Sequence, residues 1–330
     1  MELKRRREKV LGALETGNYI HAVLENVIAE GLDRSEAEIR RSAEEYSVKY
    51  LRTVFGGSDL PAGFSAHYKR LVEKSVRLLM MFKEELAQSE FVPAAFEASI
   101  SEGGDVNPVV IPLDGGSVRL VGIADRVDVY EKDGRKYVRI VDYKSGSREF
   151  DLQYVYYGLD IQMLMYLYAI RQNGTALFGQ TVPAGCMYVG ANPKTVKLEK
   201  NENPANAAEE QLKKLPRSGI FLDNGDVLRA MDSGLDGRYI PVKDGGRSNP
   251  LITEEQFGKL FSHIKEILRD MGEMLLNGRT EKNPIKTRDK DSCKYCVYAP
   301  YCFNDGKGRT LGNIDISNIF DKIDNGGAER

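Results

Sequence analysis

The sequence predicts an α/β or α+β protein in which a small central sheet is flanked by helices. Three features lead to this prediction: helical periodicity up to about residue 95, short β-like runs up to residue 144, and an amphipathic segment over residues 253–278. Helices followed by strands, a further helix and another strand are typical of layered folds of this class. The 330 residues suffice for one large domain or two modest ones with a hydrophobic core.

Two amphipathic helices are expected within the first 95 residues. In the first helix, apolar residues recur with the spacing of one buried face: Ile20, Val23, Leu24, Val27 and Ile28. The second helix covers residues 67–86. His21 lies at the edge of the first apolar face, where a histidine is more often a packed core residue, although its imidazole is also able to bind a metal.

Short β-like runs follow at residues 95–101, 117–131 and 136–144, and Asp133-Gly134 between the last two is a strong hairpin signal. A mostly apolar helix is then expected over residues 159–174, because Asn-Gly at its end is able to stop it. A buried strand is expected over residues 184–191.

The second half of the chain is less regular. Residues 192–250 are polar and rich in Asn, Gly, Asp and Pro, which predicts loops and a small excursion. A clear helix should follow, capped by Thr253 and ended by Gly278. The tail is polar and Gly-rich and is expected to be poorly ordered. These features predict the following division: 1–95, a helical part carrying His21; 96–200, the core; 201–305, a loop excursion, helix and cysteine segment closing the same domain; 306–330, the tail.

Composition excludes several classes of protein. The net charge of −2 argues against nonspecific binding of nucleic acid by the whole surface, although a local basic groove is compatible with it. The chain lacks an apolar run of about 18 residues, and no apolar segment follows the basic N-terminus, so we expect a cytoplasmic protein without a membrane span. It also lacks a G-x-x-x-x-G-K-[ST] sequence, so we expect no ATP site of that type.

The segment IVDYKSG carries an acid and a base two residues apart, Asp142 and Lys144. Alternate residues of a strand share a face, and Asp125 lies on the preceding strand of the same hairpin. Two carboxylates on rigid strands suit Mg²⁺ or Mn²⁺, and a lysine beside such an ion is able to orient water and balance the charge of a phosphate. The alternative is a solvated ion pair at a strand edge, the commoner case for this tripeptide alone.

Further polar residues lie near this segment in the expected fold. Gln162 and Tyr166 are four residues apart on the expected helix 159–174 and share one face. Glu97 opens a strand-like run, and a solvated strand residue is the expectation for it.

Three of the four cysteines, Cys293, Cys296 and Cys302, form a compact C-x2-C-x5-C pattern. This spacing predicts metal ligands, because a secreted disulfide scaffold would be smaller and richer in cysteine. Cys186 is isolated in a strand-like run, where core packing is expected. Zinc is an alternative for the cluster, but it normally takes four donors and no histidine lies near.

Four segments, GNYIHAVLE, GIADRVDVY, IVDYKSG and QMLMY, resemble in wording and order the motifs of the RecB-like branch of the PD-(D/E)XK nucleases. The resemblance covers roughly residues 1–305. It implies a restriction-endonuclease-like core with a small mixed sheet, a helical N-terminal extension and a C-terminal iron–sulfur segment. It is closest to the nuclease domains that form the C-terminal part of one subunit of bacterial helicase–nucleases.

The resemblance also implies roles for individual residues. The implied ligands of a catalytic Mg²⁺ or Mn²⁺ ion are His21, Asp125, Asp142 and the carbonyl of Tyr143. Lys144 would orient the attacking water and stabilise the transition state, and Gln162 and Tyr166 would support the site or touch DNA. Arg126 and Asp128 are expected to hold the hairpin and its neighbours together.

In the resembling family, the three cysteines and a fourth one upstream of the histidine helix ligate a [4Fe-4S] cluster. No cysteine precedes His21 in this sequence. We therefore expect the chain to be a fragment of a longer protein, with a cluster that is complete only there.

The function expected from these features is a metal-dependent exonuclease or endonuclease acting on single-stranded DNA ends in double-strand-break processing and recombination, with a helicase subunit as partner. Two alternatives are a catalytically idle scaffold or DNA-binding module of such a complex, and an iron–sulfur electron carrier. The presence of Asp125, Asp142 and Lys144 counts against both alternatives.

Overall fold

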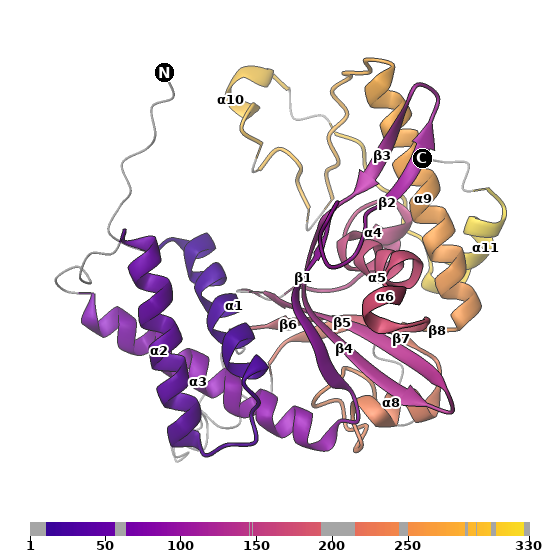
Figure 1. Ribbon diagram of the computed structural model, residues 1–330. Coiled ribbons are helices and arrows are strands. Elements are labelled where there is room, and N and C mark those ends of the chain that lie inside the picture. The colour runs from indigo at the N-terminus through magenta and orange to yellow at the C-terminus, as the bar shows by residue number, and fades with distance from the viewer. Residues whose placement is uncertain are drawn as a thin grey trace, which may run out of the picture.

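The computed structural model describes the following residues: 11–56, 64–144, 146, 148–192, 215–243, 250–287, 290–294, 296–304 and 308–326. Figure 1 shows three N-terminal helices grouped on one side of a central sheet and helices of the C-terminal half on the other side. The predicted class, a small mixed sheet flanked by helices, is confirmed.

The N-terminal helices are α1 (Ala13–Ala29), α2 (Glu36–Val54) and α3 (Ser65–Gln88). The apolar face predicted for α1 is buried against the other two helices, with Val23, Leu24 and Val27 fully inaccessible. Helix α2 begins with a capping box, in which the side chain of Ser35 accepts from the amide of Glu38 and the Glu38 side chain accepts in return. This packing holds the helix that carries His21.

The six-stranded sheet has the order β1-β4-β5-β6-β7-β8. Its strands are β1 (Val92–Ile100), β4 (Gly122–Lys132), β5 (Arg135–Lys144), β6 (Thr181–Gly190), β7 (Arg217–Leu222) and β8 (Leu251–Ile252). The β5–β6 and β7–β8 pairs are parallel and the other pairs are antiparallel. The first strand begins slightly before the expected change from helix to strand at about residue 95.

The predicted hairpin is confirmed. Asp133 and Gly134 connect β4 to β5 with positive φ angles of 53° and 73°, the conformation of a two-residue primed turn. This turn sets the register of the two strands that carry Asp125 and Asp142.

Two expectations about the strands were wrong. The run predicted over residues 117–131 is divided at Val121, because β3 (Gly116–Leu120) leaves the sheet and pairs with β2 (Val109–Leu113) in a separate hairpin. The polar region 192–250 contains β7 and α8 (Gly225–Met231), where loops were expected. Its residues 193–214 and 244–249 lie outside the described part of the chain.

On the other side of the sheet lie α4 (Leu152–Tyr156), α5 (Gln162–Asn173), α6 (Thr175–Phe178) and α9 (Glu254–Leu276). Helix α9 agrees with the sequence prediction, because Thr253 forms a capping box with Gln256 and Gly278 follows its end with φ of 67°. None of the described helices combines the length and the apolar character needed to cross a membrane.

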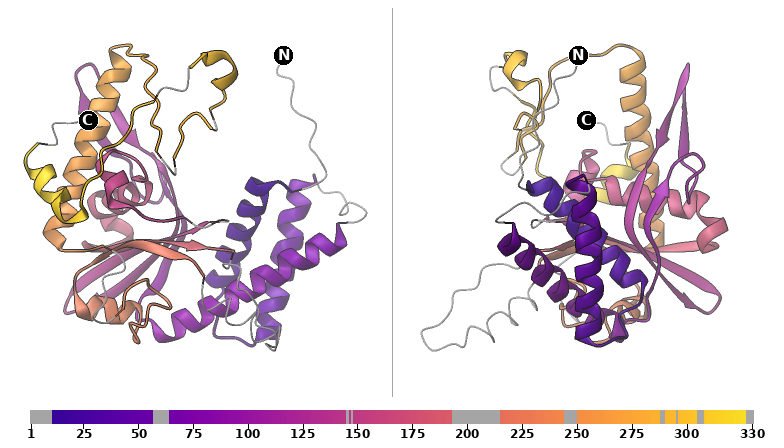
Figure 2. Two further views of the ribbon diagram at one scale, coloured as in Figure 1. Left: turned by 180° about the vertical axis from the view of Figure 1, so that it is seen from behind. Right: turned by 60° about the vertical axis from the view of Figure 1, so that its left-hand side comes forward.

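The chain ends with α10 (Ala299–Cys302), a 3-10 turn (Ile316–Asn318) and α11 (Ile319–Asp324). Figure 2 shows α10 standing away from the sheet and α11 lying beside α9. The expectation of a poorly ordered tail was wrong for its described residues, because Ile319 is fully buried and Asp324 pairs with Lys259 of α9 at 2.6 Å.

Candidate active site

A row of polar side chains crosses the sheet at the C-terminal end of β5. The register of β1 with β4 places Glu97 opposite Asp125, and the register of β4 with β5, continued by one residue, brings Asp125 opposite Asp142. Asp142 is in turn paired with Tyr188 of β6. Because paired residues on neighbouring strands point to the same face, four adjacent strands present one continuous polar row.

His21 reaches this row from α1. Its Nδ1 atom lies 3.3 Å from Asp125 Oδ2, and its Nε2 atom lies 2.5 Å from the carbonyl oxygen of Tyr143. The amide of Tyr143 donates to the same Asp125 oxygen over 2.9 Å. Three of the four groups predicted as metal ligands therefore meet at His21, which contacts both Asp125 and the Tyr143 carbonyl.

Asp142 and Lys144 lie beside this group. The Lys144 ammonium is 2.5 Å from Asp142 Oδ2, and the side chains are only 26% and 6% exposed. The two residues do form an ion pair, as the alternative interpretation proposed, but the pair is largely buried and adjoins Asp125 in the polar row.

Glu97 is a site residue that sequence reasoning missed. A ligand atom of His21, one of Glu97 and one of Asp125 all lie within 4.8 Å of one another. The expectation of a solvated strand residue was wrong, because Glu97 is half-buried and faces the other acids. It also has φ of 46°, a left-handed conformation that costs energy for a non-glycine residue and tends to occur at functional sites.

The electrostatics of the row suit a bound cation. Burial, with the charge of Asp142 acting in the same direction, raises the pKa of Asp125 to about 6 against the opposing effects of His21 and Lys144. Burial and the neighbouring carboxylates also raise the pKa of Glu97. Crowded, partly desolvated carboxylates of this kind are stabilised by a divalent ion, and the nitrogen and oxygen donors present are ligands that Mg²⁺ or Mn²⁺ accepts.

Gln162 and Tyr166 lie on α5, and Gln162 Nε2 donates to the Tyr166 hydroxyl over 2.8 Å. Tyr166 packs directly on Gly122 at the start of β4, where a Cβ atom would lie only 2.4 Å from its hydroxyl. The glycine that opens GIADR is therefore needed for this close approach. Among the described residues, no hydrogen bond or ion pair joins Gln162 or Tyr166 to His21 or Asp125.

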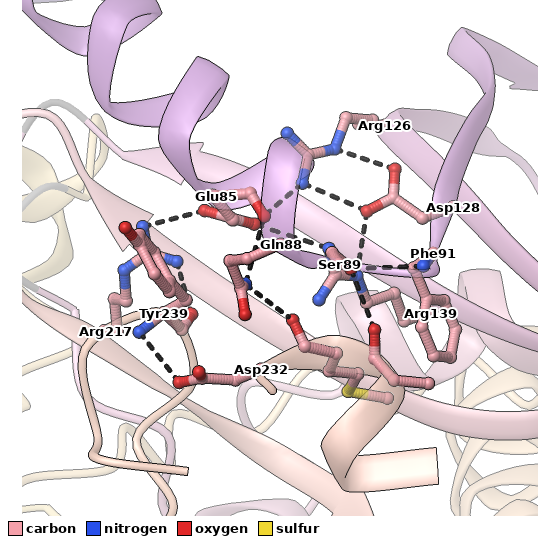
Figure 3. Close-up of polar contacts among 12 residues, drawn as sticks. Glu85, Gln88, Ser89, Phe91, Arg126, Asp128, Arg139, Arg217, Asp232 and Tyr239 are labelled. Atoms are coloured by element: carbon pink, nitrogen blue, oxygen red, sulfur yellow. Dashed lines mark hydrogen bonds and ion pairs between the residues drawn. The ribbon is translucent and has the colours of Figure 1, made fainter. Parts of the chain in front are cut away.

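Behind the row, a buried ionic network of Glu85, Arg126, Asp128, Arg139 and Arg217 fixes the opposite face of β5. Figure 3 shows Glu85 of α3 between Arg217 on one side and Arg126 and Arg139 on the other. Arg126 and Arg139 both pair with Asp128 at 2.8 Å, which joins β4 to β5 as expected. Arg126 also donates to the hydroxyl of Tyr143 over 2.8 Å, so the network supports the residue between Asp142 and Lys144.

The three clustered cysteines line a cavity of about 180 Å³ near α10. Their sulfur atoms do not all lie within 4.8 Å of one another, whereas a tetrahedral zinc site with Zn–S bonds of about 2.3 Å needs such closeness. Cys186 is fully buried in β6, and burial raises the pKa of its thiol, so it is a neutral core residue apart from this cavity. The cavity therefore brings together three cysteines, one fewer than a Cys₄ iron–sulfur cluster takes.

Comparison with known proteins agrees with the fold and the motifs. The family model of the PD-(D/E)XK nuclease superfamily matches residues 2–303. The chain belongs to this superfamily, and the resemblance and fold inferred from the sequence are confirmed.

Curated relatives of the chain are ATP-dependent helicase/deoxyribonuclease subunits of the AddB type. The protein of Thermoanaerobacter sp. (strain X514) is 32% identical over 305 residues, covering 87% of this chain and 26% of the relative. That of Clostridium acetobutylicum is 33% identical over 323 residues, covering 92% and 28%. That of Clostridium kluyveri is 30% identical over 348 residues, covering 98% and 30%. The chain thus spans somewhat more than a quarter of the length of these relatives.

Proposed function

We propose that this chain is a divalent-metal-dependent deoxyribonuclease domain that hydrolyses phosphodiester bonds of single-stranded DNA as an exonuclease or endonuclease. The observation that carries the proposal is the meeting of His21, Asp125 and the Tyr143 carbonyl beside the Asp142–Lys144 pair. Membership of a nuclease superfamily and the name of the relatives support DNA as the substrate.

In this proposal His21, Asp125, Asp142 and the Tyr143 carbonyl hold Mg²⁺ or Mn²⁺, and Glu97 lies close enough to join them. The bound ion supplies Lewis-acid stabilisation of charge on the phosphate and acidifies water in the site. Lys144 orients the attacking water and balances charge that develops on the phosphate oxygens.

The proposed role of Gln162 and Tyr166 is to support the site from α5 or to touch DNA. Their hydrogen bond and the packing of Tyr166 on Gly122 support this role, because they join α5 to the strand that carries Asp125.

The relatives suggest a setting for this activity. We propose that the chain works within a helicase–nuclease, with the helicase subunit AddA (RexA) as partner, in double-strand-break processing and recombination in the cytoplasm. ATP hydrolysis is assigned to other parts of that assembly, because the sequence has no Walker-type loop. The remaining length of the relatives leaves room for such parts.

For Cys293, Cys296 and Cys302 we propose three ligands of a [4Fe-4S] cluster whose fourth ligand comes from elsewhere in a longer protein. The cavity that the three residues line supports this assignment. Anaerobic reconstitution with iron and sulfide should give cluster absorbance only when a fourth cysteine is supplied.

The decisive experiment is cleavage of end-labelled single-stranded DNA with Mg²⁺, Mn²⁺ or EDTA, comparing the wild-type chain with Lys144→Ala. Lys259→Ala is the control, because Lys259 near the start of α9 pairs with Asp324 of α11 and with no residue of the polar row. We expect metal-dependent cleavage that is lost only in Lys144→Ala. A folded wild-type chain that neither cuts DNA nor binds Mn²⁺ would favour the catalytically idle scaffold.

A further inference from the structure

Arg148 lies just beyond β5, and its position relates it to the polar row. Its guanidinium carbon is 5.0 Å from the centre of the Tyr188 ring, and the ammonium of Lys144 is 5.7 Å from the same centre. Tyr188 is the residue paired with Asp142 on the neighbouring strand. One aromatic ring in the row therefore supports two cations, only one of which is part of the D-x-K motif.

Arg148 is held in place and still has donors to spare. Its Nη2 atom donates to Asp160 Oδ1 over 2.6 Å, and the ammonium of Lys290 contacts the other oxygen of Asp160. One carboxylate between two cations leaves net positive charge at this point. The side chain of Arg148 is 37% exposed, and it makes no other hydrogen bond with the described residues, so these residues leave most of its five N–H donors unpaired.

Tyr188 is a rigid support for this cation. The residue is 1% exposed, and its buried hydroxyl has no hydrogen-bond partner among the described residues. Buried hydroxyls are usually hydrogen-bonded, and one without a partner among the described residues is available to pair with a bound ligand or with water.

We propose that Arg148, seated on Tyr188, is a second phosphate-binding group of the site and holds a backbone phosphate of the bound DNA strand next to the one that reacts. The inference rests on the proposed function and assigns a residue outside the family motifs to strand binding. A guanidinium group matches the geometry of a phosphate and is able to donate to it while it keeps its bond to Asp160. The competing explanation is that Arg148 only ties the strand end to Asp160.

Arg238 provides a matched control for packing. Its guanidinium carbon lies 4.8 Å from the centre of the Tyr239 ring, it pairs with Glu84, and its side chain is 33% exposed. Like Arg148, Arg238 stacks on a tyrosine and pairs with one carboxylate. Unlike Arg148, it contacts no residue of the polar row. Arg238→Gln therefore removes similar packing without touching the site.

The experiment compares wild type, Arg148→Gln, Arg148→Lys and Arg238→Gln in two measurements. Affinity for a single-stranded oligonucleotide is measured in EDTA at several salt concentrations, and kcat and KM are measured with the metal. We expect Arg148→Gln to raise KM about tenfold with little change in kcat, because it removes one charge-assisted contact made equally before and during reaction. For Arg148→Gln, the slope of log binding constant against log salt concentration should become shallower by about 0.7. This is the value for one phosphate contact to a single strand.

Arg148→Lys should keep most of the salt dependence of the affinity. Arg238→Gln should match the wild type in both measurements. A wild-type slope in Arg148→Gln, or equal losses in Arg148→Gln and Arg238→Gln, would overturn the inference and leave a structural ion pair. If the wild-type chain neither binds nor cuts single-stranded DNA, the proposed function and this inference fall together. Thermal unfolding of all four proteins separates these results from loss of fold.

Discussion

The Nε2 atom of His21 lies 2.5 Å from the carbonyl oxygen of Tyr143, although the two residues are 122 positions apart. The contact joins the first described helix to the last residues of β5. It also fixes the imidazole against Asp125, whose carboxylate accepts a hydrogen bond from the amide of Tyr143. One backbone unit therefore orients both an acid and a histidine of the candidate metal site.

His21→Ala should lower affinity for Mn²⁺ at least about tenfold while leaving the fold intact, because it removes a donor without opening the sheet. Titration calorimetry with Mn²⁺ measures the change. His67→Ala is the control, since His67 in α3 packs on Phe64 with ring centres 5.1 Å apart and makes no ion pair with an acid of the row. Equal affinity in the two variants would remove His21 from the ligand set.

Glu97→Gln should lower Mn²⁺ affinity by about 10–100-fold, because the amide keeps the shape but loses the charge of a group within reach of His21 and Asp125. The same titration applies. Glu102→Gln is the matched control, because Glu102 is exposed and pairs with Arg119 on the surface at 3.0 Å. If Glu97→Gln binds the ion as well as Glu102→Gln does, Glu97 is a spectator.

Glu85→Gln tests the buried ionic network. Burial alone would raise the pKa of Glu85, but the guanidinium groups of Arg217, Arg126 and Arg139 outweigh it and hold the pKa below its ordinary value. A carboxyl with a lowered folded-state pKa stabilises the protein above its unfolded-state pKa, about 4.3, and this stabilisation is lost as the pH falls through the folded-state pKa.

At pH 7 we therefore expect Glu85→Gln to lower the free energy of unfolding by about 3–5 kcal/mol, with a gap to wild type that narrows below about pH 4. Urea unfolding at a series of pH values measures it. The neighbouring Glu84→Gln should cost less than about 1 kcal/mol throughout, because Glu84 is 56% exposed. If the difference in free energy of unfolding between wild type and Glu85→Gln did not depend on pH, the stabilising role assigned to the Glu85 charge would be wrong.

Gly219→Ala should destabilise the sheet, because an added Cβ would lie 2.2 Å from the carbonyl oxygen of Cys186 and would push β7 from β6. The expected loss is about 1–3 kcal/mol or more, as for overpacking in a core. Gly225→Ala in α8 meets nothing within 4 Å and should be neutral or slightly stabilising. Thermal unfolding of the two variants gives the comparison.

Local signals accounted for much of the fold and part of the candidate site. The period of the apolar face of α1, the Asp-Gly turn and the Thr253 cap are determined by neighbours in the chain, and all three agree with the structure. Asp142 and Lys144 were recognisable because two residues apart on a strand means the same face. Their roles in metal binding and catalysis stay predictions.

The rest depends on register and close packing, which no local pattern carries. Glu97 meets Asp125 only because β1 and β4 pair with an irregularity between Pro93 and Ala95. β7 has a short apolar run in polar surroundings, and it becomes a strand because β6 and β8 pair with it on either side. Tyr188 and Arg148 come together across β5 and β6, so their relation is invisible in the sequence.

The candidate metal ligands are spread over α1, β1, β4 and β5, so no short stretch of the polypeptide contains the site. A nascent chain on the ribosome has His21 long before Asp142 is made, and a proteolytic fragment that loses α1 lacks the histidine. In the proposed function, the metal site is complete only when the first helix has docked on the finished hairpin, so cleavage of DNA would require both parts of the chain together.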